Sequence, residues 1–210
     1  MAKVPQRYSL SSSSYLRSHE LSYAIMISLP EKLAPLSATV ALDKILAGEV
    51  LRDYRVIGKL DLLAGSSEST YFGHPILLEN CWIEELHGST LSFERPLELL
   101  NSYVHKCDLA FAYFLQGLVI EDCVFADYLD FQAGGHNKMG YPVRLLRNTF
   151  EGFVNFFDCW YEASVHIEGN KFSGGTNLLG APKHYQVTFD ELPLIQNNIG
   201  DLHRNDEAER

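Results

Sequence analysis

The stretch Gly117-Leu118-Val119-Ile120-Glu121-Asp122-Cys123-Val124-Phe125 decides the fold, because it is one copy of a pattern that recurs along the chain. The pattern is apolar-x-apolar, a polar pair, a small or polar residue, any residue, and a large apolar residue. Further copies lie at 75–83, 96–104, 142–150, 164–172 and, in degraded form, 193–199. Such self-similarity is typical of a solenoid, in which each repeat buries its apolar face against the next.

Every copy carries a small or polar residue at the same place, which we call the anchor. The anchors are Cys81, Ser102, Cys123, Asn148, Asn170 and Asn198. Their spacings of 21, 21, 25, 22 and 28 residues indicate a basic period of 21 or 22 residues with insertions. At a corner, such side chains hydrogen-bond the turn backbone or fill a tight space, so we expect the anchors to form a structural ladder.

Each repeat contains two-residue alternations, which indicate short strands with one buried face. A second strand follows the anchor at 129–131, 154–156 and 176–178, and its central residue, Asp130, Asn155 or Asn177, is expected to face solvent. The sequence therefore predicts an all-β fold, a right-handed parallel β-helix of about six coils. The alternative is a sandwich of hairpins, which is disfavoured because hairpin turn dipeptides are scarce between the copies.

The chain divides into three predicted parts. Residues 1–36 are expected to form a flexible extension, because their first stretch is polar and Ser-rich. Residues 37–200 form the β-helix, which opens with a capping helix over 37–48, begun by Ser37 and ended by Gly48. Residues 201–210 form a charged, mobile tail. Replacing Phe150 or Phe172 by Asp should break the stack, because a charge would enter its core.

Composition sets the broad class. The chain has 210 residues, 46% hydrophobic and 21% charged, which suits one soluble domain with a large core. A net charge of -10 gives no basic footprint for nucleic acid. No apolar run reaches the length of a membrane span, and no secretory segment opens the chain, so we expect a cytoplasmic protein without a membrane partner. The four cysteines form no CxxC pair, so buried free thiols are expected, with no metal and no cofactor.

Two segments carry a family resemblance. Residues 45–62, Ile45-Leu46-Ala47-Gly48 through Gly58-Lys59-Leu60-Asp61-Leu62, and residues 170–180 resemble the entry segment and the coils of pentapeptide-repeat-like β-helix proteins of prokaryotes. The resemblance implies an irregular β-helix over about 42–180 and names no catalytic motif, since the family shares none. This chain departs from the strict five-residue rhythm, because its coils exceed twenty residues. Members of the family that bind topoisomerases mimic duplex DNA, so an acidic DNA mimic is one functional alternative that the resemblance implies.

Catalysis would require carboxylates that project together from adjacent coils, as in glycosidases and lyases. The candidates are Asp127, Asp130, Asp158 and His136, the last of them in the glycine-rich insertion at 132–141. Glycine-rich loops on a rigid scaffold commonly carry function. A structural role for these residues is favoured over catalysis. Asp130 occupies the outward position of a strand, where a polar residue is expected, and His136 lies in an expected loop.

Aromatic residues beside the anchors or in the second strand are the candidate binding residues, namely Trp82, Tyr103, Trp160 and Tyr161. Those that face outward would form an amphipathic patch for a protein or a sugar, whereas the others belong to the core. The leading hypothesis is a non-enzymatic scaffold or protein-binding module with an unknown protein partner. A small carbohydrate-active protein, which binds or cleaves glycans, is the alternative. A homodimer is a further expectation, because the flat ends and faces of a β-helix often self-associate.

Overall fold

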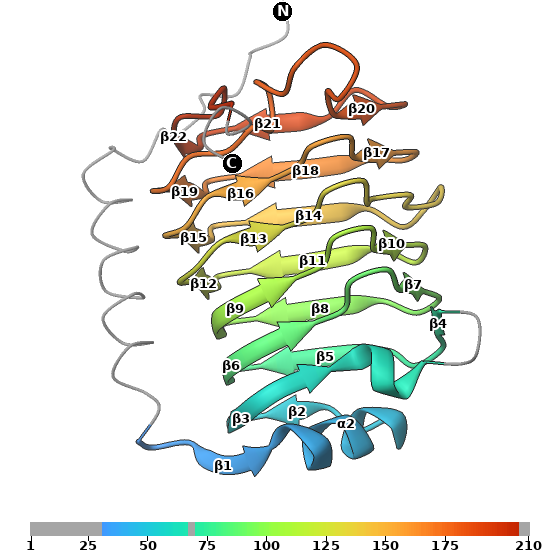
Figure 1. The fold of residues 1–210 in the computed structure, drawn as a ribbon, viewed down its shortest axis with the longest axis vertical. Helices are drawn as coiled ribbons and strands as arrows, with labels where there is room; N and C mark the ends of the chain where they lie inside the picture. The colour runs from blue at the N-terminus through green and yellow to red at the C-terminus, as the bar shows by residue number, and fades with distance from the viewer. Residues whose placement is uncertain (1–30, 67–69, 206–210) are drawn as a thin grey trace, which may run out of the picture.

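The computed structural model describes residues 31–66 and 70–205. They form a parallel β-helix of about six turns (Figure 1). Every strand pairing in it is parallel, and each coil pairs with the coils before and after it. The predicted fold class is therefore confirmed. Of the predicted flexible extension, residues 1–30 lie outside the described residues, as do residues 206–210 of the predicted tail.

Three sheets run along the solenoid and give each coil three faces. The first sheet contains β1 (Ala34–Ser37), β3 (Tyr54–Asp61), β6 (Trp82–His87), β9 (Tyr103–Asp108), β12 (Val124–Phe125), β15 (Thr149–Phe150), β19 (Lys171–Phe172) and β22 (Ile199–Gly200), with β13 (Leu129–Asp130) and β16 (Val154–Asn155) on a side branch. The second contains β2 (Leu51–Arg52), β5 (Ile76–Glu79), β8 (Leu97–Leu100), β11 (Leu118–Glu121), β14 (Val143–Leu146), β18 (Val165–Glu168) and β21 (Leu194–Gln196).

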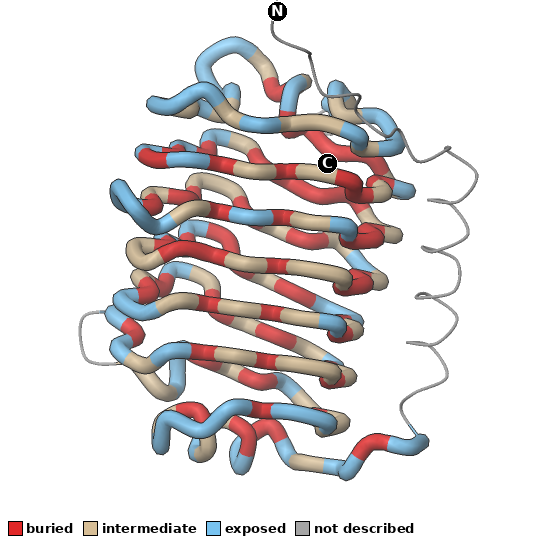
Figure 2. The backbone as a smooth tube through the Cα atoms, turned by 180° about the vertical axis from the view of Figure 1, so that it is seen from behind, coloured by how far each residue is buried: buried red, intermediate tan, exposed pale blue. Residues whose placement is uncertain are grey.

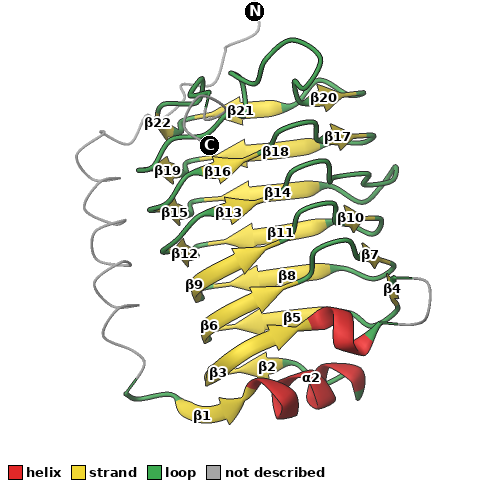
Figure 3. Cartoon of the chain, in the orientation of Figure 1, coloured by secondary structure: helices red, strands yellow, loops and turns green. Residues whose placement is uncertain are grey.

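The third face is built from short two-residue strands joined by loops (Figure 3). They are β4 (Tyr71–Phe72), β7 (Ser92–Phe93), β10 (Tyr113–Phe114), β17 (Trp160–Tyr161) and β20 (Thr188–Phe189). Single bridges from Gly135 to Tyr113 and to Trp160 join the two groups of strands into one register. The short helix η1 (Leu62–Gly65) follows β3 in the first coil.

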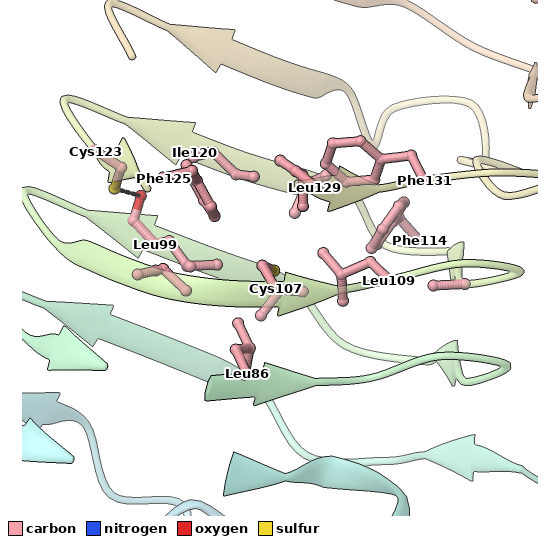
Figure 4. Packing of buried hydrophobic residues seen from close by; sticks show 14 of the residues in the cluster. Leu86, Leu99, Cys107, Leu109, Phe114, Ile120, Cys123, Phe125, Leu129 and Phe131 are labelled. Atoms are coloured by element: carbon pink, nitrogen blue, oxygen red, sulfur yellow. Dashed lines mark hydrogen bonds between the residues drawn. The ribbon is translucent and has the colours of Figure 1, made fainter. Parts of the chain in front are cut away.

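The core fills the inside of the coils with aliphatic side chains and stacked rings. Strands of the second sheet alternate buried and partly exposed residues, as two-residue periodicity requires (Figure 2). Inward side chains of successive coils lie above one another in the interior, as Leu99 and Ile120 do (Figure 4). Phe150 stacks between Phe125 and Phe172, with ring centroids 5.4 Å and 4.9 Å away, and all three are fully buried. A charge at Phe150 or Phe172 would therefore enter a sealed apolar stack.

The anchor side chains form one continuous ladder of hydrogen bonds. Each anchor after Cys81 accepts the backbone N–H of the anchor one coil earlier: Ser102 Oγ from Cys81 N (3.0 Å), Cys123 Sγ from Ser102 N (3.4 Å), and Asn148 Oδ1 from Cys123 N (2.9 Å), followed by Asn170 and Asn198 in the same way. The Asn side chains also donate to a carbonyl of the preceding coil. The ladder thus pairs the anchor N–H groups at the corner and joins them to carbonyls of the second sheet.

The residue before each anchor turns the chain in the left-handed region. Asn80, Asn101, Asp122, Arg147 and Asn197 all have φ between 47° and 56°. Asn and Asp tolerate this conformation better than most residues, which explains the polar pair in the repeat. Gly169 occupies the same place with φ 67°, so the corner geometry is common to all of these coils.

A helix covers the N-terminal end of the stack (Figure 1). It is α2 (Ala38–Leu46), with Ser37 as N-cap and Gly48, at φ 78°, just beyond the end. Gly48 N donates to Ile45 O and Glu49 N donates to Lys44 O, both at 2.9 Å, which is the Schellman arrangement. The first sheet already begins at β1, so paired structure starts three residues before the predicted boundary at 37.

The predicted tail is packed where the structure describes it. Thr176 N donates to Asp201 O and Leu179 N donates to Leu202 O. The Arg204 side chain donates to Gly174 O at 2.6 Å and lies 5.5 Å from the centre of the Phe153 ring. Residues 201–204 therefore cover the last coil, in contrast to the mobile tail that their charge predicted.

Candidate functional site

The first candidate carboxylate, Asp130, belongs to a column of polar side chains where the first sheet ends. Strand register and one bridge place Asp61, His87, Asp108, Asp130, Asn155 and Asn177 in this column. Asn155 and Asn177 are both buried, so the prediction that they face solvent is wrong. Asn155 Nδ2 donates to Asp130 Oδ1 at 2.9 Å and Asn177 Nδ2 donates to Asn155 Oδ1 at 2.7 Å. The column is a second ladder at a second corner.

Members of the second ladder also stabilise the turn that follows them. Asp108 Oδ1 accepts from Ala110 N at 3.0 Å, and Asp130 Oδ1 accepts from Gln132 N at 2.9 Å. These side chain to backbone bonds, two residues apart, are Asx turns. The carboxylate of Asp130 is thus held by an amide side chain and a backbone N–H, an arrangement that serves the corner.

Asp158 and Asp127 lie at exposed turns. Asp158 has φ 57°, and Thr90, Phe111 and Ala133 have positive φ at the equivalent turn of earlier coils. Asp158 is therefore a residue type suited to a left-handed corner. Asp127 Oδ1 accepts the N–H of Tyr128 at 2.8 Å. His136 lies on the third face, away from the corner that holds Asp130. The candidate catalytic residues are therefore divided between two parts of the coil.

The insertion at 132–141 has two different halves, although the sequence suggested one protruding loop. Gly134, Gly135 and Asn137 are buried, and Gly135 bridges the neighbouring coils. Asn137 Nδ2 donates to Tyr141 O at 2.9 Å, which closes the second half into a turn. Met139, 86% exposed, lies at the tip of that turn. Only the second half projects.

Exposed rings recur along the third face, at the edge of the solenoid that carries β4, β7, β10, β17 and β20 (Figure 1). Register aligns one outward position from each coil into a column: Tyr71, Ser92, Tyr113, Gly135, Trp160 and Thr188. Every second member is aromatic, and Tyr71, Tyr113 and Trp160 are 43%, 38% and 45% exposed. We call these three residues the aromatic column. The inward neighbours Phe72, Phe93 and Phe114 are fully buried, which fixes the outward direction of the column.

His136 occupies the interval between two of these rings. Its ring centroid lies 4.1 Å from that of Tyr113 and 5.4 Å from that of Trp160. His136 Nδ1 is 2.9 Å from Glu162 Oε1, and Trp160 Nε1 donates to Asp190 Oδ1 at 3.0 Å. A Cβ at Gly135 would lie within 3.0 Å of Trp160 O, so the backbone of the next coil approaches closely beside His136. Tyr113, His136 and Trp160 thus form a continuous surface of rings whose orientation two carboxylates help to fix.

The position two residues beyond the aromatic column is acidic in three of the six coils, where Glu94, Glu162 and Asp190 are all exposed. The other three coils carry Gly73, Leu115 and the buried Asn137 there. Register places them on the same side of the rings, because each follows its column residue, Ser92, Trp160 or Thr188, by two positions. We call these three residues the acidic column. The third face therefore presents rings beside negative charge.

The four predicted aromatic binding residues separate into three environments. Trp160 belongs to the third face, whereas its neighbour Tyr161 is fully buried and stacks on Phe189 at 5.6 Å. Trp82 and Tyr103 are half-buried on the outer side of the first sheet and stack on each other at 5.6 Å with an angle of 6°. Sequence reasoning did not single out Tyr71 and Tyr113, because their place in the column depends on register.

The four cysteines are free and buried. Burial raises the pKa of Cys123 and of Cys159 to about 12, and it also raises the pKa of Cys81 and Cys107. All four thiols therefore stay protonated at neutral pH. Within residues 31–66 and 70–205, no group of three or more His, Cys, Asp or Glu side chains is placed to hold a metal ion.

Comparison of the chain with protein-family models, with curated proteins and with solved structures found no match. Among the described residues, the structure contains no helix of the length and apolar character needed to span a membrane.

Proposed function

We propose that this protein is a non-catalytic scaffold that binds another protein through its third face. The observation that carries the proposal is the aromatic column, in which Tyr71, Tyr113 and Trp160 stand exposed in register on a rigid sheet. Exposed, ordered aromatic side chains supply large contact area at a small cost in conformational entropy. Such residues dominate the binding energy of many interfaces.

The chemistry of the candidate carboxylates supports a binding role. Asp130 is engaged by Asn155 and by the N–H of Gln132, and Asp158 occupies a left-handed turn. Both arrangements stabilise corners of the coil. The coil architecture is also consistent with the relationship to pentapeptide-repeat-like β-helix proteins that residues 45–62 suggest, and we propose that relationship as well.

The test is a comparison of partner capture by matched variants from a lysate of the source cells. The Tyr113→Ala/Trp160→Ala double variant removes two exposed rings of the third face, and the control Tyr103→Ala/Trp82→Ala removes two half-buried rings of the first sheet. We expect one protein to be retained by the wild type and by the control and to be lost with the third-face variant. Equal retention by both variants, with unchanged far-UV circular dichroism, would refute the assignment of the surface.

Glycan binding is the second candidate, because exposed aromatic faces also stack against sugar rings. The same Tyr113 and Trp160 would provide the platform, and Glu162 would accept hydrogen bonds from hydroxyl groups. A glycan array probed with the wild type and the third-face variant separates the two candidates. Ring-dependent binding to one class of glycan, without a protein partner, would favour the sugar ligand.

A further inference from the structure

The spacing of the aromatic column matches the repeat of a particular peptide conformation. Tyr71 and Tyr113 are two coils apart in register, and so are Tyr113 and Trp160. At an inter-strand distance of about 4.8 Å, two coils correspond to about 9.6 Å. A polyproline II helix has three residues per turn and rises about 3.1 Å per residue, so one of its faces repeats every ~9.3 Å. The mismatch of about 0.3 Å per interval is small against the size of a ring.

The chemistry of the face agrees with this period. Proline rings pack on aromatic side chains in the proline-rich recognition surfaces of proteins, and the preformed conformation of the ligand keeps the entropic cost low. Glu162 and Asp190 of the acidic column lie against His136 and Trp160, at 2.9 Å and 3.0 Å, and offer partners to a basic residue of the ligand. The interaction of a cation with Trp160 or Tyr113 would add to the attraction.

We propose that the third face binds a proline-rich segment of a partner protein in the polyproline II conformation, with a proline on Tyr71, Tyr113 and Trp160 at every third residue and a basic residue beside Glu162 and Asp190. The inference rests on the proposed protein-binding function and specifies its ligand. His136 keeps the platform in place, because it lies between Tyr113 and Trp160 and is held by Glu162 at 2.9 Å. A platform ordered in advance reduces the entropy lost on binding.

The experiment uses a synthetic peptide of four Ala-Pro-Pro triplets with two arginines at one end. Its control has the same composition with unevenly spaced prolines. Affinity is measured by titration calorimetry, and fluorescence is followed in a Trp82→Phe background, where Trp160 is the remaining one of the two tryptophans. We expect the regular peptide to bind at least about tenfold more tightly than the control. Trp160→Ala and Tyr113→Ala should each weaken binding about tenfold or more, and Glu162→Gln should reduce its dependence on salt.

Three outcomes would overturn the inference: no binding of either peptide, equal binding of both, or binding that Trp160→Ala leaves unchanged. A β-linked oligosaccharide that binds through the same rings in place of the peptide would also overturn it and support the glycan candidate. If the peptide fails while capture of a protein partner still depends on Tyr113 and Trp160, the proposed function holds and only the nature of the ligand is wrong.

Discussion

Replacing Asn148 by Ala should destabilise the β-helix substantially, because this side chain is fully buried in the middle of the anchor ladder. Asn148 Oδ1 accepts from Cys123 N at 2.9 Å, and Asn148 Nδ2 donates to Ile120 O at 2.8 Å. Alanine leaves Cys123 N buried without a partner and removes the second bond to Ile120 O, a carbonyl of the paired strand β11. At about 1–3 kcal/mol for the unpaired N–H and about 0.5–1.5 kcal/mol for the lost bond, the free energy of unfolding should fall by about 1.5–4.5 kcal/mol.

The matched variant is Asn148→Ser, because Ser102 shows what a hydroxyl does at the same position. Ser102 Oγ accepts from Cys81 N at 3.0 Å, so a serine at 148 can restore the bond to Cys123 N but reaches Ile120 O less well. Its loss of stability should be about half that of Asn148→Ala. Guanidinium chloride unfolding followed by far-UV circular dichroism gives both values as midpoint shifts at unchanged slope. A loss below about 1 kcal/mol for alanine, or no advantage of serine over alanine, would refute the role assigned to the ladder.

Three further outcomes are expected. Gly152→Ala should lower the free energy of unfolding by more than about 2 kcal/mol, because its Cβ would lie within 3.0 Å of the Asp127 backbone. The control Gly73→Ala, whose Cβ would have its nearest contact at 3.7 Å, should be tolerated. Equal effects of the two variants in thermal unfolding would contradict the close approach at Gly152. The hydrogen bond with His166 lowers the pKa of Glu168 below 4.5, so the stabilisation by this carboxylate is complete above that pH and is lost as pH falls through the lowered pKa. Glu168→Gln should therefore flatten the acid side of a plot of Tm against pH, and an unchanged plot would exclude the linkage. The four thiols are buried, and burial raises their pKa, so they should resist iodoacetamide in the native protein at mildly alkaline pH and react in denaturant. Mass spectrometry of the alkylated protein checks this. Rapid alkylation of the native protein would mean that the coils open easily.

The sequence was most informative where one coil repeats the next. The anchors could be aligned by inspection, because a solenoid places equivalent residues in the same environment and its pattern therefore returns with each turn. The capping helix was equally readable, because Ser37 and Gly48 are local signals that need no tertiary contact. The coil fold and the covered N-terminal end could thus be predicted.

The second ladder was misread because a buried polar residue between two apolar ones resembles the outward position of a strand. Val154, Asn155 and Phe156 are all buried, since the chain bends at this corner and the simple alternation fails. One signal was present: Asp130, Asn155 and Asn177 each follow their anchor by seven residues. A polar residue at a constant offset from the anchor indicates a second ladder, because a solvent-facing position would accept a wider range of residues.

The sequence by itself determined the parallel β-helix, its anchors and its N-terminal cap, because each depends on local preference or on a pattern that repeats. Only the tertiary structure decided which aromatic residues form a surface. Tyr71, Tyr113 and Trp160 are far apart in the chain, and coils of unequal length hide their common register. The adjacent residues Trp160 and Tyr161 face opposite ways, one into solvent and one into the core. The direction in which a side chain of a two-residue strand points depends on the register of that strand with its neighbours. A shift of one residue turns every side chain to the other face.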